Sequence, residues 1–166
     1  MRTKLMVLSA VCLLAVTWSP AVAGNDNNSA GRSFGARLGY GVDPDQFVLG
    51  TQAVFGKMFK ITRFAPSFDI GFGDDVTTYT LNGDLRIFLF TPPKASTSLY
   101  AALGPTLTYW SPKNADSDLE IGFTFTAGVR IPMGHTGFYN LEARLGAGDV
   151  PDFRLMFGVL FGGVKK

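Results

Sequence analysis

The feature that most constrains this chain is a period-two alternation of apolar and polar residues, which recurs along its length after residue 32. Such alternation is typical of β-strands that bury one face. Short turn signals separate the alternating segments, so neighbouring strands must run antiparallel, and an even number of strands can close without an exposed edge. The sequence predicts eight strands, at residues 33–41, 47–60, 65–73, 76–90, 97–110, 119–131, 138–147 and 153–162.

One row of side chains on these strands is apolar, and the opposite row is small, polar or charged. The polar row is rich in Gly and Thr and poor in Lys, which suits the crowded interior of an eight-stranded barrel better than a solvated exterior. We therefore place the polar row inside and the apolar row on a lipid-facing exterior. The predicted fold is all-β, an eight-stranded antiparallel up-and-down transmembrane β-barrel. The inverted arrangement would be a soluble, lipocalin-like ligand-binding barrel.

The predicted interior contains charged residues of both signs in near balance, five arginines against four acids. They are Arg37, Asp69, Asp84, Arg86, Glu120, Arg130, Glu142, Arg144 and Arg154. Buried charges need partners, so we expect these residues to pair into a network that plugs the lumen. A narrow diffusion channel is the alternative if the network is incomplete.

The connections at one end of the predicted barrel each hold two aspartates. These are Asp43, Asp45, Asp74, Asp75, Asp116, Asp118, Asp149 and Asp152. The opposite end instead carries basic residues, namely Lys60, Arg63, Lys94, His135, Lys165 and Lys166. Asp suits tight turns because its side chain bonds the nearby backbone. A second interpretation is that this acidic rim binds Ca²⁺ or Mg²⁺, which prefer carboxylate oxygens. No other cofactor is expected.

The first 23 residues have the pattern of a secretory signal peptide. Arg2 and Lys4 precede an apolar run at residues 5–16, and the small residues at 21–23 form a cleavage pattern. The predicted organisation is a signal peptide at 1–23, a flexible periplasmic lead-in at 24–32, the barrel at 33–163 and a tail at 164–166. The formal net charge is only +2, and no basic run alternates with aromatics, so we expect no nucleic-acid partner.

The segment from residue 33 to residue 162 resembles the small outer-membrane barrels of the OmpA and OmpX type. The resemblance rests on strand count, alternation, the signal peptide and the ending FRLMFGVLFG, in which Phe161 takes the place of the terminal aromatic. It implies an exported protein in the bacterial outer membrane with a structural or interaction role. The implied partners are outer-membrane lipid and the outer-membrane assembly machinery, and we expect a monomer.

Some eight-stranded barrels of this kind are enzymes that modify lipids with a His and a Ser. This chain has a single histidine, His135, with no serine nearby and no carboxylate at a matching strand position. General-base catalysis needs such partners within hydrogen-bond reach. We therefore expect no enzymatic activity and interpret His135 as a turn residue.

Overall fold

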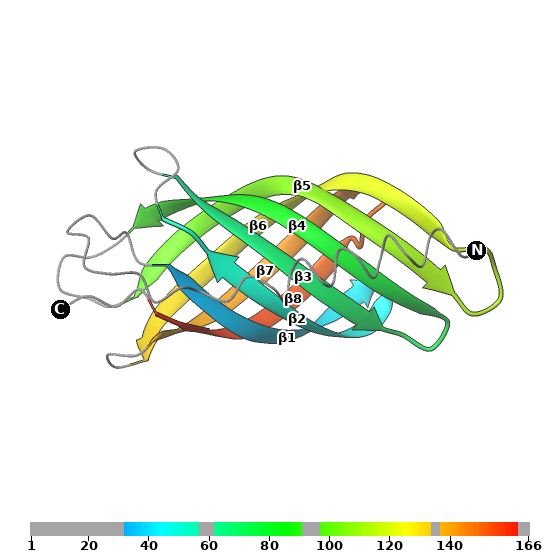
Figure 1. Ribbon diagram of the computed structural model, residues 1–166, viewed down its shortest axis with the longest axis horizontal. Coiled ribbons are helices and arrows are strands. Elements are labelled where there is room, and N and C mark those ends of the chain that lie inside the picture. The colour runs from blue at the N-terminus through cyan, green and yellow to red at the C-terminus, as the bar shows by residue number, and fades with distance from the viewer. Residues whose placement is uncertain (1–31, 57–61, 91–96, 134–136, 163–166) are drawn as a thin grey trace.

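The protein is a closed barrel of eight antiparallel strands in a computed structural model that describes residues 32–56, 62–90, 97–133 and 137–162. The strands run obliquely to the long axis of the barrel (Figure 1). They are β1 (Ser33–Asp43), β2 (Asp45–Val54), β3 (Thr62–Phe72), β4 (Val76–Phe90), β5 (Ser98–Pro112), β6 (Asp118–Met133), β7 (Gly137–Gly148) and β8 (Phe153–Phe161). Among the described residues, no helix is long and apolar enough to cross a membrane.

Each strand pairs with its neighbours in sequence, and β1 pairs with β8 to close the sheet. Closure gives every strand a hydrogen-bonded neighbour on both sides, so the barrel has no edge strand. The predicted strand count, order and direction are confirmed. The signal peptide, most of the lead-in, the tail, Lys60, Lys94 and His135 lie outside the described residues.

Two strand boundaries differ from the prediction by more than two residues. Strand β2 ends at Val54, before the predicted end at residue 60, and the residues that follow Gly56 are outside the described part. Strand β3 begins at Thr62 and includes Arg63, which the sequence analysis assigned to a basic connection. Arg63 pairs directly with Arg86 of β4, so its side chain lies on the interior face of the sheet. The tandem of Thr62 and Arg63 has no apolar alternation, which is why the pattern missed it.

A proline in the middle of a strand, such as Pro105 of β5, predicts a bulge or a bend, and the register shows no bulge there. Pairing between β4 and β5 lapses opposite Pro105, between Asn82↔Thr106 and Leu85↔Leu103, but the register is the same on both sides of the gap. The missing N–H of proline therefore removes ladder bonds without adding a residue. Register shifts occur instead between Phe88 and Phe90 of β4, and near Gly41 of β1.

Burial confirms which face is inside. The interior rows are polar and buried, whereas the large apolar side chains on the opposite row are exposed, from Phe34 on β1 to Phe161 on β8. Ile121, for example, is 71% exposed and its neighbour Gly122 is buried. An exterior with so continuous an apolar surface is the reverse of a soluble barrel, so the lipocalin-like alternative is wrong.

Aromatic side chains border the apolar exterior at both ends. Tyr40, Phe47 and Phe72 are register partners on β1, β2 and β3 near one end, and all three are exposed. Phe34 and Phe161 pair near the other end and are also exposed. Two aromatic belts with apolar residues between them are typical of barrels that span a lipid bilayer.

Candidate functional site: the interior charge network and the acidic rim

Eight of the nine predicted interior charges point into the barrel and are buried. Six strands supply them: Arg37 from β1, Asp69 from β3, Asp84 and Arg86 from β4, Arg130 from β6, Glu142 and Arg144 from β7, and Arg154 from β8. Each lies in the interior phase of its strand, where side chains at alternate positions share one face.

Glu142 is the centre of these contacts. Arg37 donates to its carboxylate at 2.9 Å, Arg86 at 2.8 Å and Arg144 at 3.3 Å. The side chains of Gln52, Tyr100 and Asn140 also donate to Glu142 Oε1, at 3.0, 2.7 and 2.7 Å. A carboxylate this deeply buried is stable only when ion pairs and hydrogen bonds replace its hydration.

Two further ion pairs extend from this centre. Arg37 and Asp69 form a bidentate ion pair, in which Nε donates to Oδ1 at 2.7 Å and Nη2 donates to Oδ2 at 2.6 Å. Such bidentate pairs fix geometry as well as charge. Arg144 bonds Asp84 at 2.8 Å while its other nitrogen faces Glu142. The three buried acids therefore lie in one connected network across the lumen.

Gln52, Tyr100 and Asn140 were not among the residues predicted for the network. Each lies on a predicted strand in phase with the interior row, so phase alone would have found them. Tyr100 is fully buried, and its ring occupies the space beside Gly128, where an added Cβ would overlap the ring. The glycine on β6 is thus required by the aromatic residue on β5.

Glu120 does not belong to this network, which corrects the sequence analysis. Glu120 is half-exposed near the start of β6, beside Asp118 and Asp149. Pairing between β6 and β7 begins only at Gly122↔Gly148, so the part of β6 that carries Glu120 projects beyond β7. Alternation gave the correct face of the strand, but the height along the barrel axis places Glu120 at the rim.

The interior consequently has an excess of positive charge rather than a near balance. Five buried arginines face three buried acids, Asp69, Asp84 and Glu142, in the part of the chain that the structure describes. Arg154 donates to Thr78 and Thr80 at 3.1 and 3.2 Å and lies 4.0 Å from Asp69. Arg130 has no ion pair with a described residue and stacks instead on Phe138, at 3.5 Å from the ring centroid.

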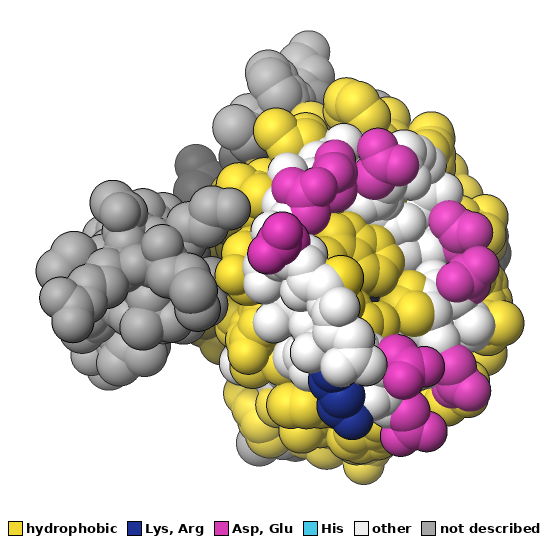
Figure 2. Space-filling model, turned by 90° about the vertical axis from the view of Figure 1, so that its right-hand side faces the viewer, with side chains coloured by type: hydrophobic (Ala, Val, Ile, Leu, Met, Phe, Trp, Pro, Cys, Tyr) yellow, Lys and Arg dark blue, Asp and Glu magenta, His cyan; other side chains and the backbone are white. Residues whose placement is uncertain are grey.

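The end of the barrel that carries the β1–β2, β3–β4, β5–β6 and β7–β8 turns is ringed by carboxylates (Figure 2). All eight aspartates of the predicted acidic rim are exposed there: Asp43, Asp45, Asp74, Asp75, Asp116, Asp118, Asp149 and Asp152. Several take part in turn structure. Asp118 accepts from the N–H of Leu119 at 2.8 Å, and the Tyr40 hydroxyl donates to Asp45.

Apolar residues close the mouth inside this ring, where Figure 2 shows hydrophobic side chains at its centre. Val150 is 4% exposed and Pro151 is buried, although both lie in the turn between β7 and β8. Val150 packs over Gly122 and Gly146, where added Cβ atoms would lie 2.8 and 2.9 Å from its methyl groups. The Asp152 N–H donates to the Asp43 carbonyl at 3.0 Å, and Trp110 Nε1 donates to the Asp149 carbonyl at 3.1 Å. We call the turn at residues 149–152 the cap.

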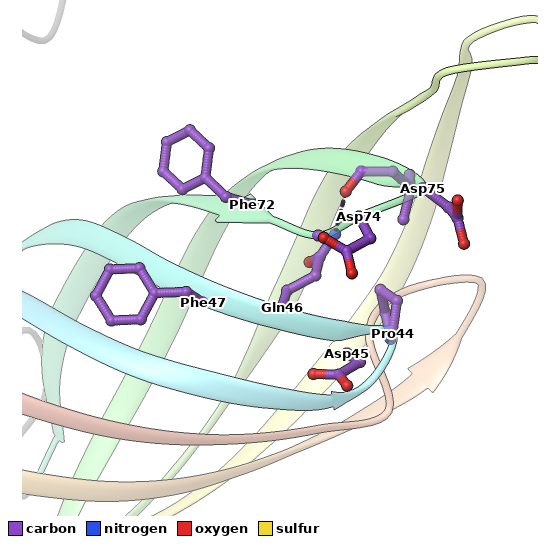
Figure 3. Close-up of a pocket in the computed structure, with 9 residues that line it drawn as sticks. Pro44, Asp45, Gln46, Phe47, Phe72, Asp74 and Asp75 are labelled. Carbon is purple, nitrogen blue, oxygen red and sulfur yellow. Dashed lines mark hydrogen bonds between the residues drawn. The ribbon is translucent and has the colours of Figure 1, made fainter.

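A cleft of about 370 Å³ lies on the acidic rim between the β1–β2 and β3–β4 turns (Figure 3). Phe47 and Phe72 project from its lipid-facing side, and Asp45, Asp74 and Asp75 border it at the rim. Gln46 forms its floor, bonding the Val76 carbonyl at 2.9 Å and the Thr78 hydroxyl at 2.8 Å. The cleft therefore has one aromatic and one acidic side.

No three acidic or histidine side chains converge in metal-binding geometry within residues 32–56, 62–90, 97–133 and 137–162. The rim carboxylates are spread around the mouth. Binding of Ca²⁺ or Mg²⁺ at the rim stays a prediction.

Solved structures with the same architecture come from bacterial barrels. The N-terminal β-barrel domain of Pseudomonas aeruginosa OprF matches with a TM-score of 0.68 at 13% identity, over 80% of this chain and 97% of that one. The Yersinia pestis outer membrane protein Ail, in a phospholipid bilayer nanodisc, matches with a TM-score of 0.51 at 14% identity, over 80% and 99%. The outer membrane enzyme PagL matches with a TM-score of 0.50 at 8% identity, over 78% and 97%.

This chain has the fold of the small eight-stranded outer-membrane β-barrels. No protein-family model matches the sequence, and no curated protein matches it. At identities this low the likeness concerns the fold alone, and the function must be argued from the residues.

Proposed function

We propose that the protein is an integral β-barrel of the bacterial outer membrane with a structural or interaction role and a closed interior. The observation that carries this proposal is the pairing of an exposed apolar exterior with a buried ionic interior. In water that arrangement would expose the apolar row and bury the charges, whereas in a bilayer both faces are matched to their surroundings. The Ail structure, solved in a phospholipid bilayer nanodisc, supports the same environment.

Two layers of side chains support a closed interior. The ion pairs of Glu142, Asp69 and Asp84 span the lumen at mid-height. The cap, with Val150 and Pro151 buried, covers the acidic end. A small eight-stranded barrel has room for side chains but little more, so two such layers would leave no continuous water path.

The proposed partners follow from the exterior and from β8. Outer-membrane lipid would contact the apolar belt. Strand β8 alternates exposed Leu155, Phe157 and Phe161 with buried residues, and this C-terminal pattern would present the chain to the outer-membrane assembly machinery. Both edges of the sheet are paired within the chain, which supports a monomer.

A narrow channel is the second candidate, and two observations favour it. The interior has two more buried arginines than buried acids among the described residues. Nitrogens of Arg86, Arg130 and Arg154 also lack a hydrogen-bond partner there. Such unpaired donors are uncommon in a sealed core. A channel of this kind would favour anions.

We propose no enzymatic activity for the chain. PagL shows that an outer membrane enzyme can have this architecture. His135, the only histidine, lies outside the described residues, and the sequence has no serine near it and no carboxylate at a matching strand position.

Heat modifiability tests the membrane proposal. The chain without residues 1–23 is refolded in detergent, and a parallel sample is kept in buffer alone. We expect a fast-running band that boiling abolishes and that forms only with detergent. A compact β-protein that forms equally well in buffer would contradict membrane insertion.

Planar-bilayer conductance then distinguishes the closed barrel from the channel. The fast-running species is added to a bilayer in symmetric salt, with a denatured sample as the control. We expect no unitary steps beyond those of the control. Reproducible anion-selective steps would replace the closed barrel with the channel.

A further inference from the structure

The interior mouth opposite the acidic rim carries arginines that no described acid neutralises. Arg63 of β3 and Arg130 of β6 both face the lumen near this end. None of the ion pairs of the described residues includes either of them. Arg86 lies next to them, and only one of its nitrogens is paired, with Glu142 at 2.8 Å.

Aromatic rings hold these guanidinium groups in place. Arg63 and Arg130 both stack on Phe88, at 4.8 and 5.9 Å from its ring centroid. Arg130 also lies 3.5 Å from the Phe138 centroid, and Arg86 lies 3.9 Å from that of Tyr100. Stacking leaves the edge of each guanidinium, with its N–H donors, free to face an anion.

The arrangement is unfavourable without a counter-charge. Arg63 and Arg86 are directly opposite each other on β3 and β4, and like charges in that position destabilise a sheet. Arg63, Arg86 and Arg130 are also close enough for mutual repulsion. Arg130 is only 4% exposed, and its Nε is buried without a hydrogen-bond partner. A group in this position normally has a partner, so the cluster is suited to a bound oxyanion.

We propose that Arg63 and Arg130 form an anion site at this mouth of the barrel, and that its ligand is a phosphate group. Arg63 is half-buried, so an anion can reach it from the barrel end, whereas Arg130 and Arg86 provide the buried positive field behind it. The planar donor edges of two guanidinium groups match the oxygens of phosphate. The phosphate can belong to a free ion or to the headgroup of an anionic lipid.

The test compares the unfolding midpoint of the refolded, boil-sensitive barrel in zwitterionic vesicles with sodium phosphate or with sodium chloride at equal ionic strength. The wild type should show a saturable rise in midpoint with phosphate. Arg63→Gln and Arg130→Gln should each lose that rise. Lys113→Gln, which removes a positive charge from the exposed β5–β6 turn at the other end, is the matched control and should keep it.

The measurements in sodium chloride provide a second test, which compares the stability of Arg63→Gln with that of the wild type and does not require the Arg130 variant to fold. Without phosphate, Arg63→Gln removes like-charge repulsion and should be at least as stable as the wild type, and with phosphate it should be less stable. Phosphate also stabilises proteins through exclusion from their surfaces, an effect that all variants would share. An equal rise in the wild type, Arg63→Gln and Lys113→Gln would therefore overturn the proposal.

Vesicles that contain phosphatidylglycerol distinguish the two sources. If these vesicles raise the midpoint without added phosphate, and Arg63→Gln abolishes the rise, the ligand is a lipid headgroup. If only dissolved phosphate does so, the ligand is a free phosphate. An absence of any Arg63-dependent rise in either medium would refute the site.

Discussion

The interior network and the acidic rim both contain carboxylates, yet the surroundings of those carboxylates differ. Glu142 is 1% exposed and accepts from three arginines, whereas the rim aspartates are exposed to water and have no arginine partner among the described residues. A buried charge without its partners is costly, whereas an exposed one is solvated and screened. Location along the barrel axis therefore determines what a charge contributes to stability.

The largest expected effect comes from breaking the centre of the network. Glu142→Gln removes the charge that compensates Arg37, Arg86 and Arg144 while keeping the volume of the side chain. Loss of one member of a buried ion pair typically costs about 3–5 kcal/mol, and we expect a loss of that size in the free energy of unfolding. Urea titration in vesicles, followed by Trp110 fluorescence, measures it.

Glu120→Gln is the matched control, because it makes the same chemical change on the neighbouring strand at the rim. Its unfolding midpoint should equal that of the wild type. If both variants were equally stable, the network would have no stabilising role, and the contrast between interior and rim would fail.

The eight strands and their interior faces were predictable because alternation is a local property of each strand. The position of Glu120 was not, since it depends on how far β6 extends past β7, which is set by register across several strands. Arg63 was missed for a local reason. Strand β3 begins at Thr62, before the alternation of apolar and polar residues becomes visible in the sequence. Both errors altered the charge count, so the excess of arginine could not be seen from the sequence.

The cap shows a second limit. Turns are usually on the surface, and nothing in the letters DVPD of residues 149–152 indicates burial. Val150 is buried because Gly122 and Gly146, on two other strand segments, leave space beneath it. That complementarity is a property of the assembled barrel.

A smaller loss is expected from crowding the network. Gly128→Ala places a methyl group where the buried Tyr100 ring lies, and the ring must move away from Glu142 and Asn140 to admit it. Overpacking typically costs about 1–3 kcal/mol. Gly83→Ala, where an added Cβ has only contacts of 3.6 Å or longer, should change stability far less. The same urea titration compares them, and equal losses would show that Tyr100 adapts freely.

Shortening a side chain of the cap should reduce the free energy of unfolding by less than crowding the network does. Val150→Ala removes two methyl groups from the packing over Gly122 and Gly146, with an expected loss of about 1–2 kcal/mol. The barrel should remain non-conducting, because the ion pairs at mid-height are intact. Unfolding and planar-bilayer recordings of one preparation test both parts. Conductance steps in this variant alone would mean that the cap, and not the network, closes the lumen.

The smallest effect is expected at the rim. Asp74→Asn with Asp75→Asn removes two exposed charges beside the acidic side of the cleft but leaves the backbone bond from Lys113 N–H to the Asp75 carbonyl. Without divalent cations the unfolding midpoint should not change, because exposed charges contribute little.

Calcium then decides between the two interpretations of the aspartates. If the rim binds Ca²⁺ through these carboxylates, added calcium should raise the melting temperature of the wild type and shift its loop resonances, and the double variant should respond less. If the wild type does not respond, the aspartates act as turn residues, as the bond from Leu119 N–H to Asp118 suggests for one of them. The rim would then differ from the interior even more sharply, since its carboxylates would pair neither with a basic side chain nor with a metal cation.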